Sequence, residues 1–195
     1  MNARSAELLQ QGQSVWQDDI SRQMLQSGEI QRMIDLGIRG LTSNPSIFEK
    51  AIAAGDAYDP DVARMAAEGM DAAAIFEAVS VQDIRDACDL FRPIYDASAG
   101  GDGFASIEVS PGAARDTETT RQETRHLWQA VGRPNVMVKI PGTAEGAPVV
   151  REMLEEGLNI NITLLFSIAS YERVALAYVE ALEARLQAGQ PIDRI

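Results

Sequence analysis

The strongest constraint on this fold is an alternation of short apolar segments with longer amphipathic segments, repeated five times along 195 residues. The short segments are rich in β-branched residues and have the length of strands. The longer segments place apolar residues at helical spacing. Strands that alternate with helices in this way predict a parallel sheet covered by helices. The expected strands are residues 14–18, 38–42, 104–109, 136–140 and 159–163.

The expected helices fill the segments between and after these strands. The helix after the second strand is expected to begin at Ser46, which has capping-box spacing to Glu49. The helix after the fourth strand is expected to have Thr143 as its N-cap. The remaining expectations are a lead-in helix or frayed end over 1–12, helical segments over 20–35 (broken at Ser27-Gly28) and 59–98 (broken near Gly69), and helices over 116–131 and 167–188.

Two architectures fit this order, a doubly wound sheet and a (β/α)8 barrel. The first strand is followed by neither a Gly-x-Gly-x-x-Gly run nor a Walker A run, which disfavours the nucleotide-binding version of the doubly wound sheet. The length suits one domain with a sizeable core, and we expect residues 1–195 to form a single domain.

Composition excludes several classes of function. The formal net charge of −12 argues against a nucleic-acid or anionic-membrane surface. Cys88 is the only cysteine, so no intrachain disulfide and no cysteine-based metal site is expected. His126 is the only histidine, so no histidine-rich metal site is expected, and no Ser-His-Asp triad either. No apolar run approaches the ~20 residues of a membrane span, and residues 1–12 lack the apolar stretch of a signal peptide. A cytoplasmic protein is the expectation.

Lys139 is the candidate nucleophile. It lies inside the apolar run of the fourth expected strand, and a Pro-Gly turn follows at once. Burial disfavours the charged ammonium form of a lysine, so such a side chain can act as a nucleophile. The alternative is a strand-end lysine whose charged end reaches solvent.

Strand side chains alternate between the two faces of a sheet, and each expected strand puts a polar or ionisable group on one of these faces, at or near its carboxyl end. In a barrel this face would look inward, near the carboxyl ends where (β/α)8 enzymes build their sites. Taken singly, a strand-end Asp is often a helix cap and a strand-end Thr is usually structural. The polar groups of this face are Asp18, Thr42 and Asn44, Glu108, Lys139, and Asn161 with Thr163.

Five segments that contain these residues resemble transaldolase in its longer bacterial form, in order from about residue 13 to the end of the sequence. The resemblance extends to polypeptides in which a glucose-6-phosphate isomerase domain follows the transaldolase barrel. The segments are Gln13-Ser14-Val15-Trp16-x-Asp18 with Ile20-Ser21-Arg22, residues 40–48, Glu108-Val109-Ser110-Pro111, Val138-Lys139-Ile140-Pro141-Gly142-Thr143-x-Glu145-Gly146 and residues 161–167.

The resemblance implies a (β/α)8 barrel and a cofactor-free, class I aldol mechanism acting on sugar phosphates. Lys139 matches the Schiff-base lysine, and Asp18 matches the general acid/base of the first strand. Glu108 and Thr163 match the pair that positions a water for imine formation and hydrolysis. Asn44 and Asn161 match residues that hydrogen-bond the substrate hydroxyls, and Thr42 lies near them by strand parity.

The sequence departs from the family in one respect. Five strand–helix units are present, whereas a (β/α)8 barrel has eight units and about 250 residues. No positions match the serine and arginines of later strands that hold the sugar phosphate in the family. We expect exposed edges at the first and fifth strands, with self-association through them. Two alternatives to transaldolase remain: a class I lysine aldolase that acts without transfer, and an inactive half-barrel that needs further strands.

Overall fold

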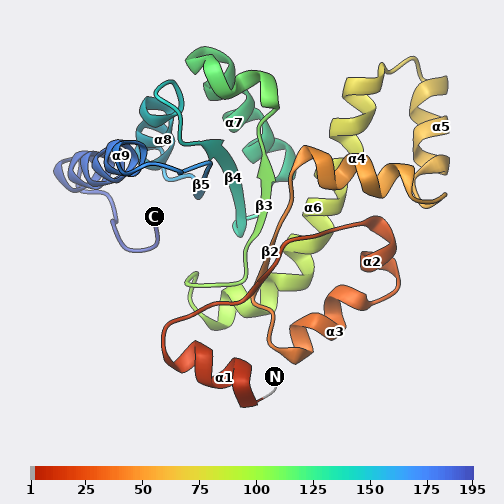
Figure 1. Ribbon diagram of the computed structural model, residues 1–195, viewed down its shortest axis with the longest axis horizontal. Coiled ribbons are helices and arrows are strands. Elements are labelled where there is room, and N and C mark those ends of the chain that lie inside the picture. The colour runs from red at the N-terminus through yellow and green to blue at the C-terminus, as the bar shows by residue number, and fades with distance from the viewer. Residues whose placement is uncertain (1–2) are drawn as a thin grey trace. The chain divides into compact units, whose positions relative to one another are not determined.

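The computed structural model describes residues 3–195 (Figure 1). The first two residues of the expected lead-in segment lie outside this range. Contacts group the chain into two compact units, one formed by residues up to Ile107 with Arg133–Val136 and one by Glu108–Gly132 with Met137–Ile195. Each unit has an apolar core of its own. The expectation of a single domain stays a prediction.

Five strands form one sheet whose order follows the chain. The pairs β1–β2, β2–β3 and β4–β5 run parallel, as the alternation of strands and helices predicts. The first strand is shorter than expected, because only two residues of the segment 14–18 form a strand. The strands are β1 (Trp16–Gln17), β2 (Gly40–Thr42), β3 (Ala105–Glu108), β4 (Val136–Pro141) and β5 (Ile160–Thr163).

The helices of the first unit break where the sequence predicts. The αL backbone of Gly28 separates α2 from α3, and Gly69 (φ +86°) lies between α5 and α6. The longest helix, α6, continues through Pro93. The six helices described in this unit are α1 (Ala3–Gln10), α2 (Arg22–Gln26), α3 (Glu29–Leu36), α4 (Pro45–Ala53), α5 (Asp59–Ala67) and α6 (Ala72–Ala97).

The cap of α4 differs from the expectation. Asn44, and not Ser46, is the N-cap, and its side chain accepts a hydrogen bond from the Ile47 N–H at 2.9 Å. Pro45 explains the shift, because proline suits the first helical position and leaves the extended residue before it to cap. The helix therefore begins directly at the carboxyl end of β2.

A buried ionic network joins α2, α5 and α6. The Arg22 Nε donates to Asp83 Oδ1 at 2.9 Å, and the Tyr58 hydroxyl donates to Asp83 Oδ2 at 2.7 Å. Asp83 is fully buried, and this burial raises its carboxyl pKa while Tyr58 and Arg22 act against the increase. Arg22 also reaches Asp61 at 2.5 Å. The network ties the segment after β1 to the helices that follow β2.

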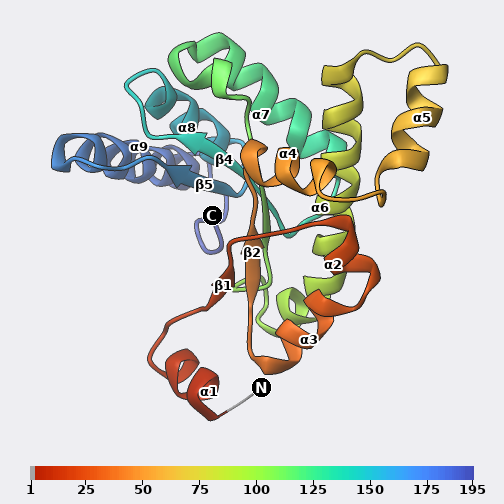
Figure 2. The ribbon, with the colours of Figure 1, turned by 45° about the vertical axis from the view of Figure 1, so that its right-hand side comes forward.

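The second unit packs helices against the apolar face of β4 and β5. Figure 2 shows α8 and α9 lying together beside these strands. Ile140 of β4 is buried in one cluster with Val150 and Met153 of α8 and Val174 of α9. The helical elements of this unit are η1 (Pro111–Arg115), α7 (Thr117–Val131), α8 (Gly146–Glu155) and α9 (Ile168–Gln187).

The start of α8 also differs from the expectation. The helix begins at Gly146, three residues after Thr143. Thr143 still contributes, because its Oγ1 accepts a hydrogen bond from the Gly146 N–H at 3.0 Å. The chain turns so tightly here that a Cβ on Gly146 would lie 2.2 Å from the Pro141 carbonyl oxygen. Within residues 3–195, no helix is long and apolar enough to cross a membrane.

Candidate active site

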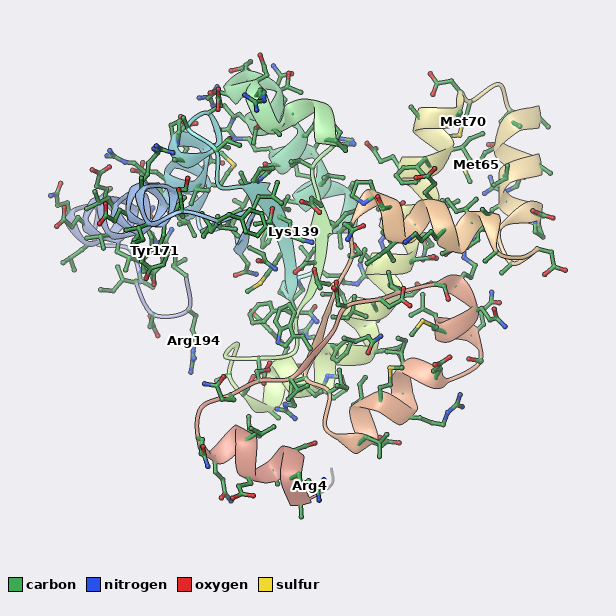
Figure 3. The ribbon with its side chains drawn as sticks, in the orientation of Figure 1. Arg4, Met65, Met70, Lys139, Tyr171 and Arg194 are labelled. Carbon is green, nitrogen blue, oxygen red and sulfur yellow. The ribbon has the colours of Figure 1, made fainter. Side chains whose placement is uncertain are left out.

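Lys139 lies on β4 (Figure 3). Only 7% of the residue is exposed. Its strand neighbours Val138 and Ile140 point to the opposite face and are fully buried. The Lys139 Nζ is 3.3 Å from Glu108 Oε2, so the amine is directed to this carboxylate inside the protein. A lysine whose amine reaches into bulk solvent, the alternative left open by the sequence, does not fit this geometry.

Glu108 links the lysine to a hydroxyl. It is the last residue of β3, and its Oε1 accepts a hydrogen bond from Thr163 Oγ1 at 3.2 Å. Its other oxygen faces Lys139. The Glu108 carboxylate therefore has the Lys139 amine at one oxygen and the Thr163 hydroxyl at the other.

Asn161 completes the group predicted for the second unit. The β4–β5 register places Asn161 beside Lys139 and Thr163 beside Pro141, so these side chains share one face. On the opposite face, Ile160 and Ile162 pack against the core under α8 and α9. In these strands the polar row and the apolar row follow the alternation predicted from sequence.

The three other predicted residues lie in the first unit, at or just beyond the carboxyl ends of β1 and β2. Asp18 is exposed and follows β1 directly. Asn44 caps α4, which occupies its Oδ1 and leaves the amide Nδ2 suited to donate to a ligand. Among residues 3–195, the Thr42 Oγ1 is one of the few enclosed side-chain oxygens without a hydrogen bond. Such a hydroxyl is expected to find a partner in a bound molecule or water.

The described side chains of the second unit bring a primary amine, a carboxylate and a hydroxyl together. A primary amine next to a carboxylate can form an imine with a ketone, and the carboxylate stabilises the resulting positive charge. The whole sequence has only two lysines, Lys50 and Lys139, and Lys50 is an exposed residue of α4. Residues 3–195 contain no group of three or more His, Cys, Asp or Glu side chains arranged to hold a metal ion.

The comparison with protein families shows which family the chain belongs to. Residues 15–188 match the model of the family described as transaldolase/fructose-6-phosphate aldolase. The chain belongs to this family. The parallel strand–helix order is therefore that of a transaldolase barrel, with five of its β/α units present, and the predicted fold class is confirmed.

Curated transaldolases are similar to the chain over almost its whole length. A transaldolase of Trichodesmium erythraeum is 50% identical over 185 residues, covering 94% of this chain and 49% of that protein. Transaldolase 2 of Nostoc punctiforme is 50% identical over 190 residues, covering 97% and 50%. A transaldolase of Mycobacterium tuberculosis is 44% identical over 195 residues, covering 100% and 52%. The chain thus spans about half the length of these relatives.

Proposed function

We propose that this chain carries the Schiff-base half of a transaldolase. The reaction transfers a dihydroxyacetone unit between sedoheptulose 7-phosphate/glyceraldehyde 3-phosphate and erythrose 4-phosphate/fructose 6-phosphate, in the pentose phosphate pathway. The observation that carries the proposal is the buried Lys139, whose Nζ lies 3.3 Å from Glu108, itself hydrogen-bonded to Thr163. Membership of the transaldolase/fructose-6-phosphate aldolase family supports it.

Imine formation is the step for which the geometry of the second unit is best suited. The Lys139 amine adds to the substrate ketone, and the adduct loses water to give a protonated imine. Glu108 accepts and returns the protons of this exchange, with Thr163 holding the departing water. The same pair positions the water that later hydrolyses the imine. The carboxylate of Glu108 stabilises the positive charge on nitrogen.

Cleavage and transfer require a second base, and Asp18 takes this role. It removes the proton from the hydroxyl at the carbon–carbon bond that breaks, while the imine accepts the bonding electrons to form an enamine. The enamine then attacks the aldehyde of the acceptor, and Asp18 returns the proton. Asn44, Asn161 and Thr42 hydrogen-bond the hydroxyls of the bound unit, and the mechanism uses no cofactor.

A second function follows from the family itself, whose description includes fructose-6-phosphate aldolase. An aldolase would release free dihydroxyacetone from the donor without an acceptor. The names of the relatives favour transfer, since the three compared above are transaldolases. A third reading, a half-barrel inactive without further strands, rests on the chain's spanning about half of those relatives.

The experiment that separates these functions supplies fructose 6-phosphate with and without erythrose 4-phosphate. A transaldolase forms sedoheptulose 7-phosphate only with the acceptor and releases little free dihydroxyacetone. Equal donor cleavage in both reactions contradicts transfer and assigns the aldolase. A protein that neither transfers nor cleaves, yet forms the trapped Lys139 imine, assigns the half-barrel reading. Lys139→Arg is the matched control, because it keeps the charge and removes the nucleophile.

The expected partners, location and self-association of the chain are part of the same proposal. The partners are sugar phosphates, and the net charge of −12 supports the absence of nucleic acid and anionic membrane surfaces among them. A cytoplasmic location follows from the same enzyme assignment. Self-association through the edges of β1 and β5 stays a prediction.

A further inference from the structure

The strand that carries Glu108 is held at its exit by a helix side chain that no step of the reaction uses. Glu123, on α7, accepts a hydrogen bond from the Ser110 backbone N–H at 2.6 Å with one carboxylate oxygen. Its other oxygen accepts from the Ser110 hydroxyl at 2.7 Å. A carboxylate that accepts two such bonds fixes both the backbone and the side chain of Ser110.

A second α7 side chain supports the same loop. Thr120 lies three residues before Glu123, so both face the same side of the helix. The Thr120 hydroxyl donates to the Ala113 carbonyl at 2.7 Å, and Thr120 is only 1% exposed. The loop after β3, including η1, is thus attached to α7 at two points.

The attachment begins close to the reactive groups. The Val109 N–H donates to the Lys139 carbonyl at 3.2 Å, which joins the end of β3 to β4. The next residue is Ser110, held by Glu123. The two residues after Glu108 are therefore both held in place: Val109 is bonded to β4 and Ser110 is bonded to α7. Without the bonds between Glu123 and Ser110, the end of β3 that carries Glu108 could rotate about the hydrogen bond between Val109 and Lys139.

We propose that Glu123 is a positioning residue, which fixes the strand exit at Ser110 and so keeps the Glu108 carboxylate between Lys139 and Thr163. The Glu123 carboxylate accepts its hydrogen bonds from Ser110, so it acts through Ser110 and not on substrate. The consequence for the rate rests on the proposed function, whereas the consequence for the position of Glu108 does not. Displacements of about 1 Å in such a group can cost on the order of 10²-fold in rate.

The test compares Glu123→Ala with Ser110→Ala and with Glu118→Ala. Ser110→Ala loses the hydroxyl bond and keeps the backbone bond. Glu118→Ala is the matched control, because it removes the same charge from the same helix, and its partners are Arg121 and Gln122 rather than the loop. Should Glu123→Ala fail to fold, Glu123→Met takes its place, since it keeps a long side chain and its thioether sulfur is only a weak acceptor for the two bonds.

The first readout is independent of activity. With lysine labelled with ¹³C at Cε, the protein has only two lysine signals, and Lys50→Arg assigns them. We expect Glu123→Ala to move the Lys139 signal toward its position in Glu108→Gln, Ser110→Ala to move it less, and Glu118→Ala to leave it in place. A Lys139 signal that is the same in Glu123→Ala as in Glu118→Ala overturns the proposal.

The second readout is the rate at which cyanoborohydride traps dihydroxyacetone on Lys139. We expect about a tenfold loss in Glu123→Ala at unchanged melting temperature, with a smaller loss in Ser110→Ala. An unchanged rate in folded Glu123→Ala contradicts a positioning role. Absence of trapping in the parent protein refutes the proposed function, and the lysine signals then still decide whether Glu123 positions Glu108.

Discussion

At the scale of single residues, the two oxygens of Glu108 have different partners. Oε2 faces the Lys139 amine at 3.3 Å, and Oε1 accepts the Thr163 hydroxyl at 3.2 Å. The hydroxyl bond orients the carboxylate, so the oxygen next to the lysine has a fixed direction. In the proposed mechanism, a water that takes part in imine chemistry exchanges protons with Glu108 while Thr163 holds it.

Replacing Glu108 and Thr163 tests these separate roles of the carboxylate and the hydroxyl. We expect Glu108→Gln to slow imine formation by about 10²–10⁴-fold, because the proton acceptor is lost. Thr163→Val keeps the carboxylate and removes its orientation, so we expect a smaller loss of about tenfold. The double variant should be no slower than Glu108→Gln alone, since the hydroxyl acts through the carboxylate. Stopped-flow trapping rates measure all three, and additive losses would contradict the shared role.

Cys88 gives a prediction about pH. It is fully buried in α6, and burial raises the pKa of its thiol from 9.0 to about 12. The folded protein therefore keeps the neutral thiol over a range in which the unfolded chain ionises. Stability contributed by Cys88 is fully present below pH 9.0 and is lost as the pH rises toward about 12, by at most ~1.4 kcal/mol per pH unit.

Two measurements check the behaviour of Cys88. At about pH 8, iodoacetamide should alkylate the native protein far more slowly than the urea-unfolded chain, because the native thiol is enclosed and protonated. Cys88→Ala should reduce the slope of unfolding free energy against pH above pH 9.0. Rapid alkylation under native conditions, or an unchanged slope in the variant, would contradict the burial of this thiol.

At the scale of elements, the tight turn between β4 and α8 determines how the strand of Lys139 ends. The Gly142 N–H donates to the Thr163 carbonyl at 2.7 Å, which joins this turn to β5. Gly146 then starts the helix in direct contact with the Pro141 carbonyl. The turn therefore connects the ends of the two strands that carry Lys139 and Thr163.

A methyl group at Gly146 should disturb this turn. A Cβ there would lie 2.2 Å from the Pro141 carbonyl oxygen, so the backbone must move. We expect Gly146→Ala to lower the free energy of unfolding by about 1–3 kcal/mol and to slow imine trapping. Urea unfolding measures the first effect. Gly55→Ala is the control, because nothing lies within 4 Å of its Cβ position, and an equal loss there would refute the explanation.

The elements show which features of a sequence predict structure. Apolar periodicity predicts where strands and helices occur, because each element must bury one face. It also predicts that Lys139, Glu108, Thr163 and Asn161 share one face, since side-chain alternation has a fixed period. The cap positions were wrong at Ser46 and Thr143, because Pro45 and the close approach at Gly146 decide the helix starts. Such local backbone geometry leaves no periodic signal.

At the scale of the whole molecule, contacts between distant segments are the part that periodicity cannot predict. Arg22 and Asp83 are separated by 61 positions, and Ser110 and Glu123 by 13. In the sequence, Glu123 belongs to a charged helix segment like any solvent-facing one. Arg22 belongs to a segment that resembles transaldolase, but the resemblance assigns it no partner. These pairs become visible only when the packing of the helices is known.

One face of α9 carries exposed apolar side chains, which favour self-association of the chain. Val179 and Leu186 are 49% and 63% exposed, and Ile168 and Tyr171 at the start of the helix are 77% and 61% exposed. Figure 3 marks Tyr171 on this helix. An apolar stripe of this kind favours pairing with a second copy. We expect light scattering to show a concentration-dependent dimer of the chain.

Charge substitutions in the stripe test this expectation. Val179→Arg and Leu186→Glu should shift the equilibrium to the monomer, because each places a charge in the apolar contact. Gln187→Glu, which adds a charge at an already polar position of α9, should leave the dimer intact. A chain that stays monomeric at high concentration, or a dimer that survives both stripe substitutions, contradicts association through this face.

The central claim is that Lys139 is the Schiff-base nucleophile, and the chain offers a direct test because it contains only two lysines. Dihydroxyacetone with cyanoborohydride supplies the transferred unit without a phosphate, and peptide mass mapping locates the reduced adduct. We predict one three-carbon adduct on Lys139, formed much faster than any on the exposed Lys50, and its loss in Glu108→Gln. Labelling that favours Lys50 or the terminal amine over Lys139 would contradict the claim.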